Sequence, residues 1–166
     1  GVQTPVQLSL QFTTDHYGPS SGDEYALIKS QLESTGLFQV NLQSTEWTQY
    51  SKDRTADVYP AYQLGWFPDY SDADNYLTPF FLTENFLSNH YSNQQVNDLI
   101  LQQATTPDPA ARQALIEQIQ QLEAQDLSTL PYLQGAQVAV VRTGVEGAAD
   151  TLDASFKFRY GALSQG

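Results

Sequence analysis

Two short segments that alternate apolar and polar residues flank a helical pattern near the start of the chain, and this order constrains the fold most. Residues 6–12 read VQLSLQF and residues 38–42 read FQVNL, with the period of two that is typical of half-buried strands. Parallel strands need a long crossover between them, and a helix can supply it. We therefore expect a βαβ unit with a right-handed connection.

The helix between these two strands has recognisable start and stop signals. Ser21 followed three residues later by Glu24 fits a capping box. Gly36 is a plausible C-terminal stop. The apolar residues that fall on one face of this helix are Tyr25, Ile28 and Leu32.

Helical and extended patterns continue through the rest of the chain. Asp108 and Pro109 predict a helix start, with Asp108 as the N-cap and Pro109 at the first helical position. The fold class is therefore α/β, with a mixed β-sheet flanked by helices, and we expect residues 1–166 to form a single domain. The other predicted elements are a helix over 46–54, a strand over 62–66, helices over 93–104 and 109–127, extended segments at 130–132 and 138–141, and a final strand over 155–160.

Charge and composition exclude several classes of protein. The net charge of −12 argues against nucleic acid and anionic membranes as partners, because both need a cationic face. The chain has no cysteine, so disulfides and thiolate metal sites are excluded. It has no apolar run of about 18 residues, so no transmembrane helix is predicted. It also has no methionine, from which we expect a chain that is processed or cut from a longer one.

The most aromatic segment of the chain, LGWFPDYSDADNYLTPFF at residues 64–81, also contains Asp69, Asp72 and Asp74. A Ser-His-Asp arrangement has no support, because His16 and His90 lie in loop-like segments without a nucleophile motif. A calcium loop of the EF-hand type fails on the positions of its ligands and its glycine. Two clustered carboxylates also suit a glycosidase. A different calcium site and a carboxylate-based hydrolase remain alternatives, and so does a domain with no ligand at all.

Asp69, Asp72, Asp74 and Asn75 of this segment divide into two predicted roles. Asp72 or Asp74 can cap a helix that starts near Asn75, and Asn75 can bond turn backbone, so these three residues are expected to be structural. Asp69 follows Pro68 at the end of a predicted strand, where open α/β sheets bind ligands. We expect it to be partly buried beside an indole, a setting that favours a bound cation.

The motif Gly65-Trp66-Phe67-Pro68-Asp69-Tyr70, followed by Asp72-Ala73-Asp74-Asn75-Tyr76-Leu77, resembles the G-W-x-x-D-Y…D-x-D-N-[FY]-L segment of extracellular solute-binding proteins of family 5. These are the peptide-binding and nickel-binding receptors of ABC importers. Other segments resemble this family in the same order along nearly the whole chain. They are Ile28 to Gly36, Glu46-Trp47 through Tyr50, Tyr91 to Ile100 and Arg112 through Tyr132.

The resemblance implies a two-lobed receptor that encloses its ligand, with this chain as the C-terminal lobe and the N-terminal lobe of the parent chain as its partner. It implies a periplasmic-binding-protein-like fold, an extracytoplasmic location, either in the periplasm or as a cell-surface lipoprotein of the parent chain, and delivery of the ligand to an ABC permease in the membrane. It implies no cofactor, no metal and no catalytic residue.

The resemblance also implies roles for single residues. In peptide-binding members the Asp of G-W-x-x-D-Y bonds the α-ammonium of the ligand, which corresponds to Asp69, and Trp66 lines the pocket with Phe67 and Pro68. Other peptide receptors have a basic residue three positions before the Trp, where this chain has Gln63. Gln63 is expected to belong to the ligand site, but it brings no charge to a ligand carboxylate. Peptides are the expected ligand, with a nickel chelate or an oligosaccharide as the alternative within the family.

Overall fold

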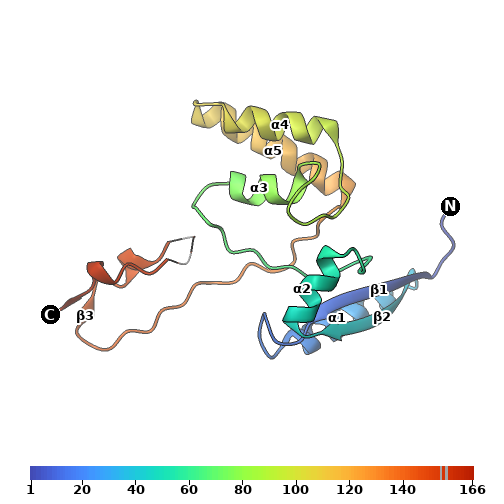
Figure 1. Ribbon diagram of the computed structural model, residues 1–166, viewed down its shortest axis with the longest axis horizontal. Coiled ribbons are helices and arrows are strands. Elements are labelled where there is room, and N and C mark those ends of the chain that lie inside the picture. The colour runs from blue at the N-terminus through green and yellow to red at the C-terminus, as the bar shows by residue number, and fades with distance from the viewer. Residues whose placement is uncertain (154, 156) are drawn as a thin grey trace. The chain divides into compact units, whose positions relative to one another are not determined.

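The computed structural model describes residues 1–153, 155 and 157–166, and divides them into two compact units, Gly1–Gly65 and Trp66–Gly166. Each unit has helices and strands of its own, shown along the chain in Figure 1. The two units are described separately below.

The first unit contains the βαβ arrangement that the sequence predicts. Strand β1 (Val6–Thr13) pairs in parallel with β2 (Phe38–Thr45), from Val6 opposite Phe38 to Thr13 opposite Thr45. The connection between them is helix α1 (Ser21–Ser34). The ring of Phe12 on β1 stacks on that of Tyr25 on α1, with 4.9 Å between ring centroids, so α1 covers the apolar face of the strand pair.

The start of α1 differs from the prediction, and its end agrees with it. Ser21 is the first helical residue rather than the cap, and Ser20 at the N-cap position makes no side-chain capping bond. The capping box over Ser21 and Glu24 is therefore wrong. Gly36 has a φ of +70°, and its N–H donates to the carbonyl of Glu33, as expected of a C-terminal stop.

The predicted third strand is much shorter than residues 62–66. Only Tyr62 forms a bridge, in parallel with Gln11 of β1. The N–H of Gln11 donates to the carbonyl of Ala61 at 3.0 Å, and the N–H of Gln63 donates to the carbonyl of Gln11 at 3.0 Å. Strand β1 thus lies between β2 and residues 61–63, and regular pairing ends before the Gly-Trp motif begins.

Helix α2 (Trp47–Thr55) agrees with the predicted short helix and fastens residues 61–63 to β1. The Glu46 carboxylate accepts hydrogen bonds from the backbone N–H groups of Thr48 and Gln49, which is the ordinary N-cap interaction. Tyr50 is fully buried. Its hydroxyl accepts from the N–H of Gln63 and donates to the carbonyl of Gln63, both at 2.8 Å.

The second unit begins with three helices that form its core. They are α3 (Asp74–Phe81), α4 (Gln94–Ala104) and α5 (Pro109–Asp126), and Figure 1 shows them in green to orange. The Asp108 side chain caps α5 and Pro109 opens it, as predicted. The buried residues that the three helices share are Leu77, Val96, Leu99, Ile100 and Ile119.

The C-terminal part of the second unit differs from the predicted strands. Residues 129–142 contain neither helix nor strand, so the segments 130–132 and 138–141 find no sheet partner within the described chain. The final strand predicted over 155–160 is wrong where it is described, because Ser155 lies in a turn and Tyr160 begins a 3-10 helix; Phe156 lies outside the described residues. The elements present are β3 (Val145–Glu146), η1 (Ala149–Thr151), η2 (Tyr160–Ala162) and β4 (Ser164–Gln165), with β3 and β4 antiparallel.

None of the helices that the structure describes has both the length and the apolar composition needed to cross a bilayer.

Candidate ligand-binding site

The loop that carries Asp69 is closed by a single buried side chain. Asn75, in the first turn of α3, is 4% exposed. Its Oδ1 accepts hydrogen bonds from Nε1 of Trp66 at 3.0 Å and from the backbone N–H of Asp69 at 2.8 Å. One amide oxygen therefore holds both the indole and the backbone of the aspartate.

The aromatic residues of this loop have unequal exposure. The Trp66 ring makes edge contacts with Phe80 at 5.3 Å and with Phe86 at 5.5 Å, measured between centroids. Pro68 is buried, whereas Phe67 is 56% exposed. Trp66 and Pro68 thus anchor the loop in the second unit, and Phe67 leaves more than half of its side chain exposed.

Asp69 itself is exposed, where the sequence suggests partial burial. Its carboxylate makes no hydrogen bond or ion pair with the described residues, although its backbone is held on both sides. The N–H donates to Asn75, and the carbonyl accepts from Nζ of Lys157 at 2.9 Å. The result is an unpaired carboxylate on a fixed main chain, which suits a cation that comes from outside.

Asp72 is bound to the start of α5 by an ion pair. The Arg112 guanidinium donates from Nη1 to Oδ2 at 2.8 Å and from Nη2 to Oδ1 at 2.6 Å, a bidentate fork. Oδ1 of Asp72 also accepts from the N–H of Asp74 at 2.8 Å. The hydrogen bonds from Arg112 and from the Asp74 backbone lower the pKa of Asp72 to about 2, so this carboxylate is charged at neutral pH.

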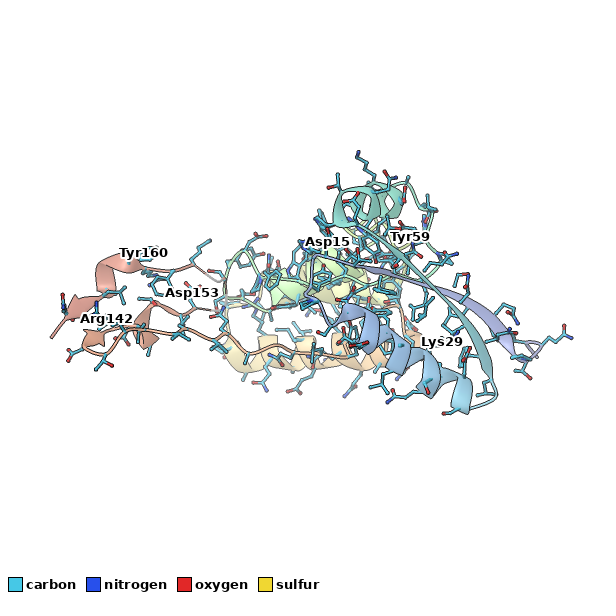
Figure 2. The ribbon with its side chains drawn as sticks, turned by 90° about the horizontal axis from the view of Figure 1, so that it is seen from below. Asp15, Lys29, Tyr59, Arg142, Asp153 and Tyr160 are labelled. Carbon is cyan, nitrogen blue, oxygen red and sulfur yellow. The ribbon has the colours of Figure 1, made fainter. Side chains whose placement is uncertain are left out.

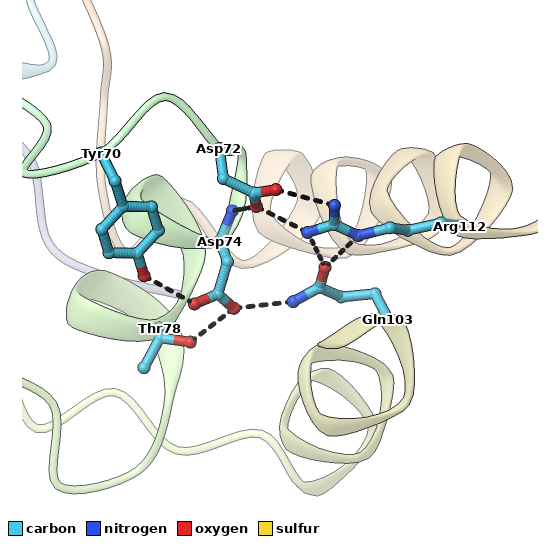
Figure 3. A network of polar contacts seen from close by, with 6 residues as sticks. All are labelled: Tyr70, Asp72, Asp74, Thr78, Gln103 and Arg112. Carbon is cyan, nitrogen blue, oxygen red and sulfur yellow. Dashed lines mark hydrogen bonds and ion pairs between the residues drawn. The ribbon is translucent and has the colours of Figure 1, made fainter. Parts of the chain in front are cut away.

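Asp74 has three side-chain partners, shown in Figure 3. Its carboxylate accepts from the hydroxyl of Thr78 at 2.9 Å, from the hydroxyl of Tyr70 at 3.1 Å and from Nε2 of Gln103 at 2.7 Å. Gln103 is fully buried, and its Oε1 in turn accepts from Nε and Nη2 of Arg112. Asp72 and Asp74 are therefore both engaged within the protein.

The residues just before the Gly-Trp motif belong to the first unit. Gln63 is 5% exposed, and its Oε1 accepts from the N–H of Thr13 at 3.5 Å. Gly65 donates its N–H to the hydroxyl of Tyr17 at 2.7 Å. The expected site residues are thus divided between the two units: Gln63 lies in the first, and Trp66, Phe67, Pro68 and Asp69 lie in the second.

A second group of side chains lies in the loop after β1, where Figure 2 labels Asp15. The rings of His16 and Trp47 stack with 3.6 Å between centroids and an interplanar angle of 4°. Oδ1 of Asp15 accepts from the N–H of Trp47 at 2.9 Å. The sequence suggests an ordinary surface residue at His16. The position of His16 just after β1 is the sequence signal for this contact with Trp47, which follows β2. Parallel strands bring the loops at their carboxyl ends together.

Sequence reasoning also assigned no site role to Arg112 and Gln103, which hold Asp72 and Asp74 from α5 and α4. Among the described residues, no three histidine, aspartate or glutamate side chains are grouped so that they hold a metal ion.

The fold resembles that of periplasmic peptide-binding proteins. The Haemophilus influenzae OppA in complex with the peptide RPPGFSPFR is similar over 97% of this chain and 31% of its own, with a TM-score of 0.77 at 19% identity. The murein tripeptide binding protein MppA of Escherichia coli is similar over 99% and 32%, with a TM-score of 0.77 at 17% identity. A dipeptide binding protein from Pseudoalteromonas in complex with Met-Leu is similar over 96% and 32%, with a TM-score of 0.75 at 20% identity.

These likenesses place the chain in the class of periplasmic-binding-protein-like α/β lobes. The profile described as bacterial extracellular solute-binding proteins, family 5 Middle, matches residues 1–88, which is more than half of the chain, and the chain belongs to this family. It spans about a third of the length of the solved relatives. A search among curated proteins finds no match.

Proposed function

We propose that this chain is part of the substrate-binding receptor of an ABC importer, and that the receptor binds peptides. The observation that carries the proposal is Asp69. Its carboxylate is exposed and unpaired within the described chain, while Asn75 holds its main chain at 2.8 Å. A charge-assisted hydrogen bond from the α-ammonium of a peptide suits this carboxylate and contributes roughly 1.5–3 kcal/mol.

The chain acts in this proposal as the C-terminal of two lobes that close around the ligand. The N-terminal lobe of the parent chain supplies the other contacts, and the loaded receptor delivers its ligand to the membrane permease. The receptor works outside the cytoplasm, as a soluble periplasmic protein or as a lipoprotein of the cell surface. Family membership and the lobe fold shared with peptide-binding proteins support this.

Phe67 contributes exposed apolar surface next to Asp69, and the partly buried Trp66 and the buried Pro68 hold the loop beneath it. Gln63 is a neutral residue whose side chain already accepts a hydrogen bond from Thr13. Position 63 therefore brings no charge to the carboxylate end of a peptide, and that end is recognised elsewhere or left in solvent.

A nickel chelate or an oligosaccharide is the alternative ligand within the family. A carboxylate-based hydrolase is the alternative of another class. It would need a second free carboxylate near Asp69. The carboxylate of Asp72 is paired with Arg112, and that of Asp74 accepts a hydrogen bond from Gln103. The family and the solved relatives are binding proteins, so the structure favours the receptor.

Native mass spectrometry of the full-length protein that contains this chain, purified without refolding, tests the proposal. Bound masses that fragment into amino-acid residues support a peptide receptor and give the length of the ligand. The mass of a metal chelate or an oligosaccharide contradicts the peptide assignment and keeps the receptor. If the protein carries nothing, turnover of chromogenic glycosides or esters that Asp69→Asn abolishes would establish the hydrolase instead.

A further inference from the structure

The acidic turn beside Asp69 is held by residues from two helices much later in the chain. Arg112 lies in the first turns of α5 and forms the bidentate ion pair with Asp72 across a sequence separation of 40 residues. Gln103 lies at the end of α4, bonds Arg112 through Oε1 and bonds Asp74 through Nε2. Figure 3 shows these four side chains as one network that crosses from α5 to the start of α3.

The network continues from the turn at Asp72 and Asp74 to the loop that carries Trp66 and Asp69. Asp72 fixes the N–H of Asp74 at 2.8 Å, which sets the first residue of α3. The next residue is Asn75, whose side chain holds Trp66 and the backbone of Asp69. Any displacement of this turn therefore moves the amide oxygen on which both groups depend.

From this geometry we propose that Arg112 is a positioning residue for ligand binding, which sets the place of Asp69 and Trp66 through Asp72 and Asn75 without touching the ligand. The inference rests on the proposed function, because Asp69 is taken as the contact to the ligand. Gln103 aligns the guanidinium, since its Oε1 lies 3.0 Å from Nε and 2.8 Å from Nη2 of Arg112.

If the Arg112–Asp72 pair only stabilised the protein, its loss would lower the melting temperature and leave the loop geometry and the affinity unchanged. The side chains of Arg112 and Asp72 are 29% and 34% exposed, and ion pairs that remain in contact with solvent contribute little to overall stability. The planar fork instead fixes direction as well as distance. The test therefore reads the geometry of the loop and the affinity, in addition to the melting temperature.

The experiment uses the full-length protein that contains this chain, with di-, tri-, tetra- and penta-alanine as probes. Arg112→Gln removes the fork, and Arg112→Lys keeps the charge but loses the bidentate geometry. Arg159→Gln is the matched control. The Arg159 side chain is exposed and forms an ion pair with Asp153, and neither residue belongs to the network of Arg112, Gln103, Asp72 and Asp74. Affinity is measured by calorimetry. The indole N–H resonance of Trp66, identified by its loss in Trp66→Phe, reports the hydrogen bond to Asn75.

We expect Arg112→Gln to lower the affinity for the alanine peptides by about tenfold or more and to shift the Trp66 indole resonance. Arg159→Gln should change neither the affinity nor the resonance. Arg112→Lys should fall between Arg112→Gln and the unchanged protein. In an Asp69→Asn background Arg112→Gln should add little further loss, because both changes remove the same contact.

Unchanged affinity in Arg112→Gln overturns the positioning role, whether or not the melting temperature falls or the resonance moves. Failure of the proposed function looks different. Either none of the alanine peptides binds the unchanged protein, or Asp69→Asn binds them equally well. The indole resonance then decides by itself whether Arg112 sets the loop, and a resonance that stays in place overturns the inference as well.

Discussion

The hydroxyl of Tyr17 accepts a hydrogen bond from the backbone N–H of Gly65 at 2.7 Å, and the Tyr17 ring fills the space that a side chain at residue 65 would need. A Cβ placed on Gly65 would lie 2.6 Å from Cε1 of that ring. Glycine therefore precedes Trp66 because a tyrosine from the loop after β1 packs directly against the backbone there.

Gly65→Ala should lower the melting temperature of the protein. The added methyl displaces Tyr17, which also contacts His16 edge-on at 4.7 Å, and such overpacking costs about 1–3 kcal/mol. Thermal unfolding followed by circular dichroism measures the shift. Tyr17→Leu removes the ring, so Gly65→Ala should cost much less in that background. Equal costs in both backgrounds would contradict the role given to Tyr17.

Asp69→Asn should weaken peptide binding by about 1–3 kcal/mol, the range for a hydrogen bond to a charged group. N-acetylation of the peptide removes the α-ammonium and should weaken binding to the unchanged protein, but should make little difference to the variant. Calorimetry with free and acetylated alanine peptides measures both effects. Asp98→Asn is the control, since Asp98 is exposed on α4 and its carboxylate accepts a hydrogen bond from the Gln94 side chain, away from the Asp69 loop. Discrimination against acetylated peptides that survives in Asp69→Asn would remove Asp69 from the site.

Asn75→Leu should destabilise the second unit more than an ordinary surface change. The substitution leaves the N–H of Asp69 and Nε1 of Trp66 without their acceptor, and an unsatisfied buried donor costs about 1–3 kcal/mol. Thermal unfolding measures the loss. Asn41→Leu, at an exposed position of β2, should change stability by only about 0.5 kcal/mol or less. Similar shifts for the two variants would show that Asn75 does not hold the loop.

Asp72 should titrate far below an ordinary aspartate. The Arg112 guanidinium, with a smaller contribution from the backbone N–H of Asp74, favours the charged carboxylate and lowers its pKa from 3.8 to about 2. Because the folded value lies below the unfolded one, the ion pair stabilises the protein above about pH 4 and is lost as the pH falls through about 2. A carboxyl carbon NMR titration should place the Asp72 midpoint near the lower value, and Arg112→Gln should raise it. A midpoint that Arg112→Gln leaves unchanged would assign the shift to another group.

Local chemistry made most of the helices predictable from the sequence. Glu46, Asn93 and Asp108 each cap the helix that follows with a side-chain oxygen, an interaction confined to a few neighbouring residues. The parallel pairing of β1 with β2 was predictable for a similar reason, since alternation marks both strands and the helix between them dictates their direction. Ser21 failed as a cap because the helix begins one residue earlier than the pattern suggests.

The later strands were less predictable, because a strand exists only where a partner pairs with it. Residues 138–141 have a strand-like pattern, but Val138 and Val140 are 82% and 94% exposed, and no partner lies among the described residues. Residues 62–66 stop pairing after Tyr62. Residue propensity indicates what a segment suits, and the presence of a neighbouring strand decides whether it forms.

The sequence by itself determined the family, the βαβ unit, and the motif that contains Trp66 and Asp69, because these depend on residue type and short spacing. Only the tertiary structure showed that Asn75 holds the Asp69 backbone, that Arg112 and Gln103 hold Asp72 and Asp74, and that Tyr17 packs on Gly65. Those contacts join residues up to 48 positions apart. A hydrogen bond needs both partners within about 3 Å, a condition that spacing along the chain does not specify and that the packing of helices and loops decides.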